Sequence, residues 1–169
     1  MTLHNHPPEA EGKTTEQGFV RQYLLYLLAA ASESLSTEFH AKVRARGVRV
    51  PEWRILACLA DEDSQMVTQL AALALMEQSR LTKTIDQMVD KKLVTRRGDE
   101  NDRRRVRVFL TAKGRKLAHE LVTEARAHEA GIINQISPAN AAALKGVLAQ
   151  IIDLHSGSDA RQDAGETKR

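Results

Sequence analysis

The chain has 169 residues, enough for one domain with a sizeable core. It carries 25 Lys and Arg against 22 Asp and Glu, and this net charge of +3 permits a nucleic-acid partner without requiring one. Hydrophobic residues make up 42% of the chain, which excludes wholesale disorder. Aromatic residues are only 4%, which favours helices packed on helices over a β-sandwich. A single cysteine, Cys58, excludes an intramolecular disulfide and a zinc site of the CxxC type.

Neither end of the chain has the pattern of a packed element. Residues 1–13 carry histidines, prolines and acids but no apolar run, so we expect a disordered arm rather than a signal peptide. Residues 156–169 hold glycines and mixed charges, so we expect a disordered tail. The uncharged stretch Gln22–Ser32 is about half as long as a membrane span. We therefore expect a single domain over residues 14–155, in the cytoplasm and without membrane contact.

Helical periodicity governs the first half of this domain. Apolar residues three or four positions apart predict a long first helix over residues 15–46, ended by Gly47. Pro51 suits the first turn of a second helix, and further helices are expected at residues 68–74 and 78–91. Three short helices with a tight break between the last two are typical of a helix-turn-helix unit.

The period then changes to that of a β-hairpin. Residues 93–97 are extended, turn residues follow from Gly98, and residues 103–110 alternate between apolar residues and arginines. Thr111 can cap a helix that ends near residue 136.

A last helix starting at Pro138 completes the expected fold. The fold is mainly α with a small β-hairpin wing. It consists of a winged helix-turn-helix over residues 48–111, flanked by N- and C-terminal dimerisation helices at 14–47 and 112–155. Because the flanking helices have apolar faces of their own, we expect them to pack together and against the same helices of a second chain.

Basic charge is concentrated in the middle of the chain. Residues 78–107 hold ten Lys or Arg and five Asp or Glu, a local balance of +5 that indicates DNA binding. The second helix of such a unit lies in the major groove, where Arg80 can pair with guanine and Gln78 with adenine. Ser79, Thr82 and Lys83 can hold phosphate. The wing arginines would follow the DNA backbone or enter the minor groove. They are Arg97, Arg103, Arg104 and Arg105.

These segments resemble the MarR family of winged helix-turn-helix regulators. The matching positions are Gln69-Leu70-Ala71, Ser79, Thr82, Ile85-Asp86, Leu93-Val94, Arg96, Asp102-Arg103-Arg104, Leu110-Thr111 and Lys113-Gly114. The wing segment DRRRVRVFLTAKG is the most specific part. The resemblance implies a homodimeric repressor that binds a pseudopalindromic operator in double-stranded DNA and is released by a small ligand. It also implies that Asp102 holds the wing rigid by pairing with Arg103 or Arg104.

The effector pocket of similar proteins lies between the first two helices and the DNA-binding lobe. Polar and aromatic residues there are the candidates. They are Ser32, Ser36, Phe39, His40, Trp53 and Arg54, with Arg21, Tyr23 and Tyr26 as candidates contributed by the partner protomer. His40 and Arg54 can neutralise a carboxylate, and Phe39 and Trp53 can stack on a ring. The segment VPEWRIL resembles members that control catabolism of aromatic or heteroaromatic acids, which implies an effector of hydroxycinnamate or nicotinate type.

Three alternatives remain open: a non-specific architectural nucleic-acid-binding protein, a protein-interaction module whose winged unit docks a partner protein, and a peroxide sensor acting through Cys58. The apolar run around Cys58 is more typical of a buried, inert thiol. No two histidines have the i, i+4 spacing of a zinc site, so we expect no metal. The chain lacks a phosphate-binding glycine loop, a GxSxG motif and a paired nucleophile and base. We therefore expect no enzyme and no cofactor, only the small-molecule effector.

Overall fold

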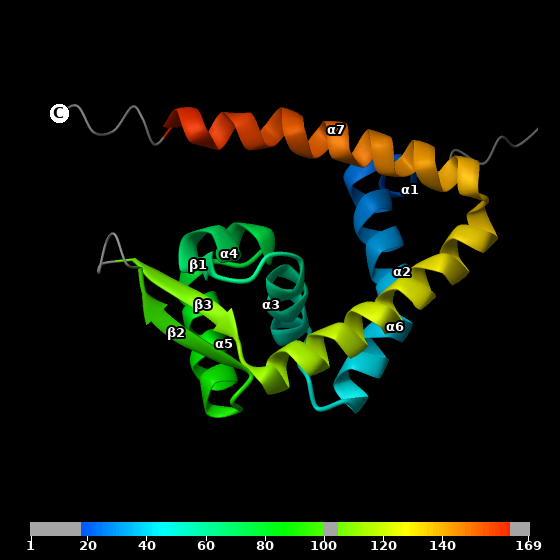
Figure 1. Cartoon of the computed structure of the whole chain (residues 1–169). Coiled ribbons are helices and arrows are strands. Elements are labelled where there is room, and N and C mark those ends of the chain that lie inside the picture. Colours follow the sequence, from blue (N-terminus) through cyan, green and yellow to red (C-terminus); the bar gives the residue numbers. More distant parts are fainter. Residues whose placement is uncertain (1–17, 100–104, 163–169) are drawn as a thin grey trace, which may run out of the picture. The chain divides into compact units, whose positions relative to one another are not determined.

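The structure is a computed structural model that describes residues 18–99 and 105–162, with side chains as far as Leu154. The described residues divide into two compact units, one up to Thr37 and one from Glu38 onward. Most described residues are helical, and three short strands form one antiparallel sheet (Figure 1). The prediction of a mainly α fold with a small β-wing is confirmed.

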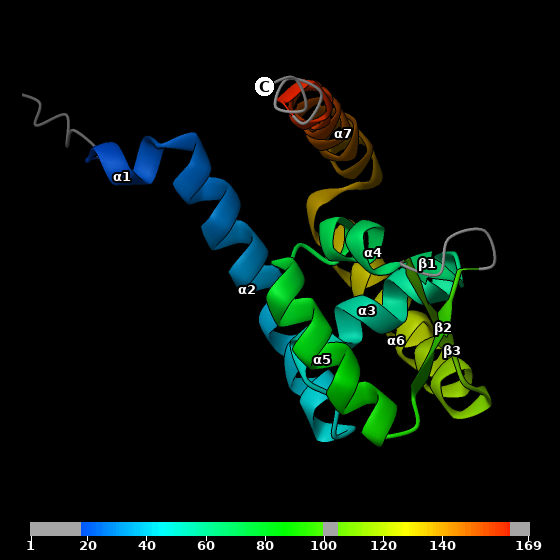
Figure 2. The ribbon, with the colours of Figure 1, turned by 90° about the vertical axis from the view of Figure 1, so that its left-hand side faces the viewer.

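The first unit holds α1 (Phe19–Gln22) and the N-terminal part of α2 (Leu24–Ala45). The prediction of one unbroken helix is wrong here, because Tyr23 has an extended backbone with ψ 119°. Figure 2 shows α1 turned away from the axis of α2. No residue of α1 is buried, so no core contact holds this end of the helix in line. At the other end the prediction is confirmed, since Gly47 follows α2 with a left-handed φ of 72°.

Within the part of the chain that the structure describes, five helices follow α2. They are α3 (Val50–Asp61), α4 (Val67–Leu73), α5 (Gln78–Asp90), α6 (Ala112–Ile136) and α7 (Pro138–Gln162). The first four agree with prediction to within a few residues, but α7 continues beyond Ser156, where the sequence predicts a disordered tail. A single glycine such as Gly157 costs a helix only about 1 kcal/mol and does not by itself end it. Within the described residues, no helix is long and apolar enough to cross a membrane.

The sheet has the strand order β1-β3-β2. Strands β2 (Val94–Gly98) and β3 (Val106–Leu110) form the predicted hairpin, with Val94 opposite Leu110. The predicted alternation is present, since Val108 and Leu110 are buried. Strand β1 (Gln65–Met66) pairs with the other edge of β3. The prediction missed β1 because two residues are too few to show alternation.

One hydrophobic core joins α3, α4, α5, α6 and the sheet. Its completely buried members include Ile55, Leu56, Leu59, Leu70, Leu81, Ile85, Met88, Val94, Val108 and Leu121. Three of them, Leu81, Ile85 and Met88, follow one another at helical spacing along α5. Because this stripe is anchored in the core, the opposite face of α5 is turned to solvent.

Thr111 and Gly114 fix the junction between the wing and α6. Thr111 Oγ1 accepts a hydrogen bond from Gly114 N at 3.0 Å, which confirms the predicted cap. The main chain of Leu93 passes so close that a Cβ on Gly114 would lie 1.9 Å from the Leu93 oxygen. Only glycine permits this approach of β2 to the start of α6.

Candidate nucleic-acid interface

The outer face of α5 carries five exposed polar residues that were singled out from the sequence. They are Gln78, Ser79, Arg80, Thr82 and Lys83. All five lie in the first two turns of the helix, while Leu81 and Ile85 between and after them are completely buried. The core therefore fixes which side chains of α5 face outward.

The two hydroxyl groups of this face are already hydrogen-bonded within the chain. Ser79 Oγ donates to Glu77 Oε1 at 2.9 Å, and Thr82 Oγ1 donates to the main-chain oxygen of Gln78 at 2.9 Å. A hydroxyl has only one proton to donate. Each must give up its present bond before it can donate to a phosphate.

A groove of about 580 Å³ separates α5 from the wing. Thr68 of α4 lines it, together with Gln78 and Thr82 of α5 and with Arg96 and Arg105 at the wing. Two guanidinium groups and several hydrogen-bonding side chains thus surround one concave surface. Such a surface suits an anionic, backbone-like partner.

Arg96 has a structural role that the sequence did not reveal. Its guanidinium pairs with the Asp86 carboxylate at 2.7 Å and donates to the main-chain oxygen of Thr82 at 3.1 Å. It therefore ties β2 to the middle of α5. Arg96 is one of the basic residues that make residues 78–107 positively charged, but α5 already binds its guanidinium.

The wing arginines differ in their surroundings. The Arg97 guanidinium lies over the Phe109 ring, 4.9 Å from its centroid, and remains exposed. Arg105 is exposed and lines the groove beside α5. Arg103 and Arg104, and the predicted wing-stabilising Asp102, lie outside the described residues. Their predicted roles stay predictions.

Within the described part of the wing, Asp99 is the acid that binds an arginine. Its buried carboxylate pairs with Arg107 Nε at 2.5 Å, and its main-chain N donates to the Arg105 oxygen at 2.8 Å. Arg107 also donates to the main-chain oxygen of Ser64 at 2.8 Å. Arg107 is therefore part of the internal framework of the wing. The alternation of residues 103–110 predicts that Arg107 lies on the arginine-rich face of the wing. It does not predict the hydrogen bond to Ser64, which is 43 residues away along the chain.

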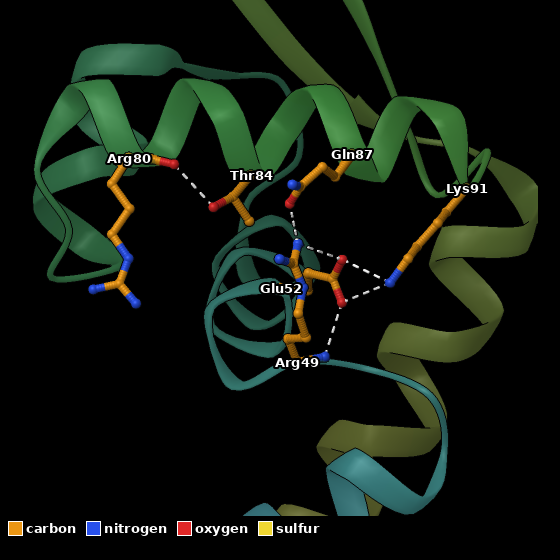
Figure 3. Close-up of polar contacts among 6 residues, drawn as sticks. All are labelled: Arg49, Glu52, Arg80, Thr84, Gln87 and Lys91. Carbon is orange, nitrogen blue, oxygen red and sulfur yellow. Dashed lines mark hydrogen bonds and ion pairs between the residues drawn. The ribbon is translucent and has the colours of Figure 1, made fainter.

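Glu52 is a completely buried carboxylate at the start of α3, and sequence reasoning missed it too. Arg49 donates to it through the backbone N at 2.8 Å and the guanidinium at 3.0 Å. Lys91 Nζ donates to both carboxylate oxygens, at 2.8 and 3.0 Å. Arg49 also donates to Gln87 Oε1, so the network joins α3 to the last turn of α5 (Figure 3). Burial alone would raise the pKa of Glu52, but the bonds from Arg49 and Lys91 prevail and hold the pKa below its ordinary value.

The structure brings four of the predicted effector residues together in the second unit. The Phe39 ring meets the Trp53 ring edge-on at 5.1 Å and lies 6.5 Å from the His40 ring. Burial, followed by the positive charges of Arg44 and Arg54, lowers the pKa of His40. His128 of α6 stacks on Phe39 at 5.8 Å. Local sequence patterns do not place His128 in this cluster, because α6 is distant from Phe39 along the chain.

The other predicted effector residues belong to the first unit. They are Arg21, Tyr23, Tyr26, Ser32 and Ser36. The Tyr23 ring stacks on Phe19 at 5.1 Å, and Ser36 Oγ donates to the Glu33 oxygen at 3.4 Å. Their assignment to an effector pocket stays a prediction.

Cys58 is half-buried in α3 beside the core. Burial, with the nearby charge of Asp61, raises the pKa of its thiol. The reactive thiolate is therefore disfavoured, as in an inert packing residue. Among the described residues no three His, Cys, Asp or Glu side chains are grouped to hold a metal ion.

A three-helix unit with an exposed polar α5, followed by a two-stranded arginine-bearing wing, defines a winged helix-turn-helix protein. Residues 48–106 match the MarR family. The crystal structure of a MarR family transcriptional regulator from Silicibacter pomeroyi DSS-3 is 53% identical, with a TM-score of 0.74. The match covers 81% of this chain and 98% of that one. The chain belongs to the MarR family and is a transcriptional regulator, not an enzyme.

Two further solved structures of similar proteins contain a bound partner, a small aromatic acid in one and a DNA duplex in the other. NadR, crystallised in complex with 4-hydroxyphenylacetate, is 30% identical with a TM-score of 0.68, and the match covers 73% of this chain and 88% of NadR. The transcriptional repressor CouR, bound to a 23-mer DNA duplex, is 25% identical with a TM-score of 0.68. That match covers 79% of this chain and 95% of CouR.

Proposed function

We propose that this regulator is a homodimeric repressor that binds a pseudopalindromic DNA operator and is released by a small aromatic carboxylate. The observation that carries the DNA-binding part is the row of exposed polar side chains on α5 beside a groove that the exposed Arg105 also lines. CouR, a relative of the same fold, binds a DNA duplex. This role also implies that the chain works in the cytoplasm, where the DNA lies.

In this proposal α5 is the recognition helix and enters the major groove. Arg80 and Gln78 read base edges, while Ser79, Thr82 and Lys83 hold the phosphates on either side. Arg97 and the arginines of residues 103–105 follow the flanking backbone. The Arg96–Asp86 pair keeps wing and helix in a fixed relation, so that both engage the same stretch of DNA.

The dimer is supported by apolar side chains that one protomer leaves exposed. The large ones on the flanking helices include Val20, Leu24, Leu27, Leu144, Val147 and Leu154. Soluble monomers rarely leave so many apolar side chains without a partner surface. A twofold dimer would present two recognition helices about 34 Å apart, which fits two half-sites one helical turn apart.

The aromatic cluster around Phe39 and Trp53 supports an aromatic effector, as does the binding of 4-hydroxyphenylacetate by NadR. Burial and the positive charges of Arg44 and Arg54 lower the pKa of His40, which disfavours its charged form when no anion is bound. Its ring N–H can donate a hydrogen bond to a carboxylate. Arg54, which is exposed, is the cation of the cluster that would pair with the carboxylate. A ligand that favours the DNA-free state by about 1.4 kcal/mol lowers DNA affinity tenfold.

The test is selection of duplexes from a random-sequence library by the full chain. The proposal predicts enrichment of an inverted repeat bound by two chains, with half-sites about one helical turn apart. Enrichment of no motif would favour the architectural alternative instead.

The effector part is tested on the selected duplex with 4-hydroxyphenylacetate and hydroxycinnamates as probes. We expect at least one of them to release the wild-type protein. Arg54→Ala should bind the duplex normally and resist release. Failure of every aromatic carboxylate to release the wild type would reject the effector class while leaving the DNA-binding proposal intact.

A further inference from the structure

Glu52 and its partners form a charged clamp between the first turn of α3 and the last turn of α5. The clamp consists of the Glu52 carboxylate, Arg49 and Lys91, with Gln87 bound to Arg49. Its acceptor is completely buried, whereas the side chains of Arg49 and Lys91 are half exposed. Figure 3 shows the two cations approaching the carboxylate from different elements.

A buried carboxylate restricts the movement of the elements that neutralise it. Removal of one partner leaves a buried charge that is only partly compensated, which costs far more than the intact pair contributes to stability. The clamp therefore opposes sliding of the first turn of α3 past the last turn of α5. The start of α6 holds the same turn, since Lys113 Nζ donates to the Lys91 oxygen at 3.0 Å.

The DNA-facing side chains lie at the opposite end of α5. At 1.5 Å per residue, Arg80 is about 10 Å along the helix from Gln87. Figure 3 shows Arg80 and Lys91 at opposite ends of the helix, with Arg80 displaced along the helix axis from Glu52. The core contacts of Leu81 and Ile85 are apolar and therefore non-directional. The hydrogen bonds of the clamp are directional, so they restrict the orientation of α5 more than the apolar contacts do.

The same turn of α3 also carries two candidate effector residues. Trp53 and Arg54 directly follow Glu52, and Trp53 packs against Phe39 at 5.1 Å. A displacement of this turn of α3 moves Glu52, and so it moves the carboxylate to which Lys91 donates its hydrogen bonds. The clamp is thus a direct physical connection between the aromatic cluster and α5.

We propose that Glu52, Arg49 and Lys91 are positioning residues that set the angle at which α5 meets DNA, and so determine operator preference. None of the three reads DNA itself in this account. The inference rests on the proposed function, since it requires that α5 reads an operator. Breaking the clamp lowers the preference for operator over other DNA, while non-specific binding to the basic surface changes only with the net charge.

The chain offers matched variants for the test. Lys91→Met breaks the clamp, and Lys91→Arg keeps a cation in it. Lys92→Met removes the same charge from the neighbouring residue, whose exposed side chain is outside the clamp. Glu52→Gln keeps the shape of the buried side chain and frees the half-exposed Lys91 to solvent. Each full-length variant is checked for folding by circular dichroism before binding is measured.

The probes are a duplex selected by the wild-type protein from a random library and a scrambled copy of it. In Lys91→Met and Glu52→Gln the affinity ratio of the two duplexes should fall about tenfold or more, comparable to one mismatched base pair. Lys91→Arg and Lys92→Met should keep the wild-type ratio. Lys91→Met and Lys92→Met should bind the scrambled duplex equally, since they have the same charge.

Two contrary results have different meanings. If folded Lys91→Met and Glu52→Gln keep the wild-type ratio, the clamp only stabilises the fold and the positioning role is wrong. If the wild type itself does not discriminate between the duplexes, the proposed function fails, and the positioning role fails with it.

Discussion

Arg96 on β2 pairs with Asp86 on α5 at 2.7 Å, so the wing and the exposed helix are fastened to each other by one guanidinium. The same guanidinium donates to the Thr82 oxygen at 3.1 Å. In a segment where most basic residues are expected to face DNA, this one serves the protein's own geometry. Its loss should therefore have different consequences from the loss of a DNA-contacting arginine.

Arg96→Ala should change the free energy of unfolding by less than about 1 kcal/mol, because exposed ion pairs contribute little. Asp86 is 56% exposed and Arg96 32%, which is the exposed case. Affinity for the selected duplex should nevertheless fall, because wing and helix are no longer fixed in one arrangement. Urea unfolding and duplex titration test the two effects. Arg126→Ala, on the exposed face of α6, is the control and should affect neither.

Arg80→Ala should cost about 1–3 kcal/mol of binding to the selected duplex and relax the base preference at one position. Lys83→Ala should instead weaken all duplexes alike and reduce the salt slope by about one. Titrations of both variants at several salt concentrations separate the two roles. Equal losses for Arg80→Ala on selected and scrambled duplexes would contradict base reading by Arg80.

Two glycines of α6 give opposite predictions for the same substitution. Gly114→Ala should destabilise the fold by about 1–3 kcal/mol, because its Cβ would meet the Leu93 oxygen at 1.9 Å. Gly131→Ala has open space around its Cβ and should stabilise the helix by about 0.5–1 kcal/mol. Thermal unfolding of both variants measures the difference. A neutral Gly114→Ala would show that β2 and α6 are not held this closely.

Glu52 should make stability depend on acid pH. Its folded pKa is lowered from 4.5, so its contribution is fully present above about pH 4.5 and is lost as pH falls through the lower folded value. Wild type should therefore be more stable than Glu52→Gln at pH 7, and the gap should narrow below pH 4.5. Urea unfolding of both proteins across this range is the measurement. A gap that stays constant would mean that the ionised carboxylate contributes nothing.

Local patterns in the sequence account for most of the elements of the second unit. The spacing of Leu81, Ile85 and Met88 predicts α5, and the alternation through Val108 and Leu110 predicts β3. The break at Tyr23 has no such signal. It arises where a helix end lacks a core to pack on, which is a property of the surroundings and not of the local pattern.

The candidate site was predictable only in part. The helical spacing of Leu81, Ile85 and Met88 predicts the buried face of α5. The exposure of Arg80 on the other face follows from it. Local sequence patterns do not predict the ion-pair partners of Arg96, Arg107 and Glu52. Glu52 meets Lys91 39 residues later, and residue type alone cannot distinguish a buried carboxylate from a solvated one.

Whether α5 recognises a DNA sequence is decided by the affinity of the chain for a wild-type-selected duplex and for its scrambled copy at two salt concentrations. Specific recognition by α5 predicts that the selected duplex binds about 1000-fold or more tightly, with a steep loss of affinity at higher salt for both. Equal affinity for the two duplexes at moderate salt would contradict sequence-specific regulation by this chain.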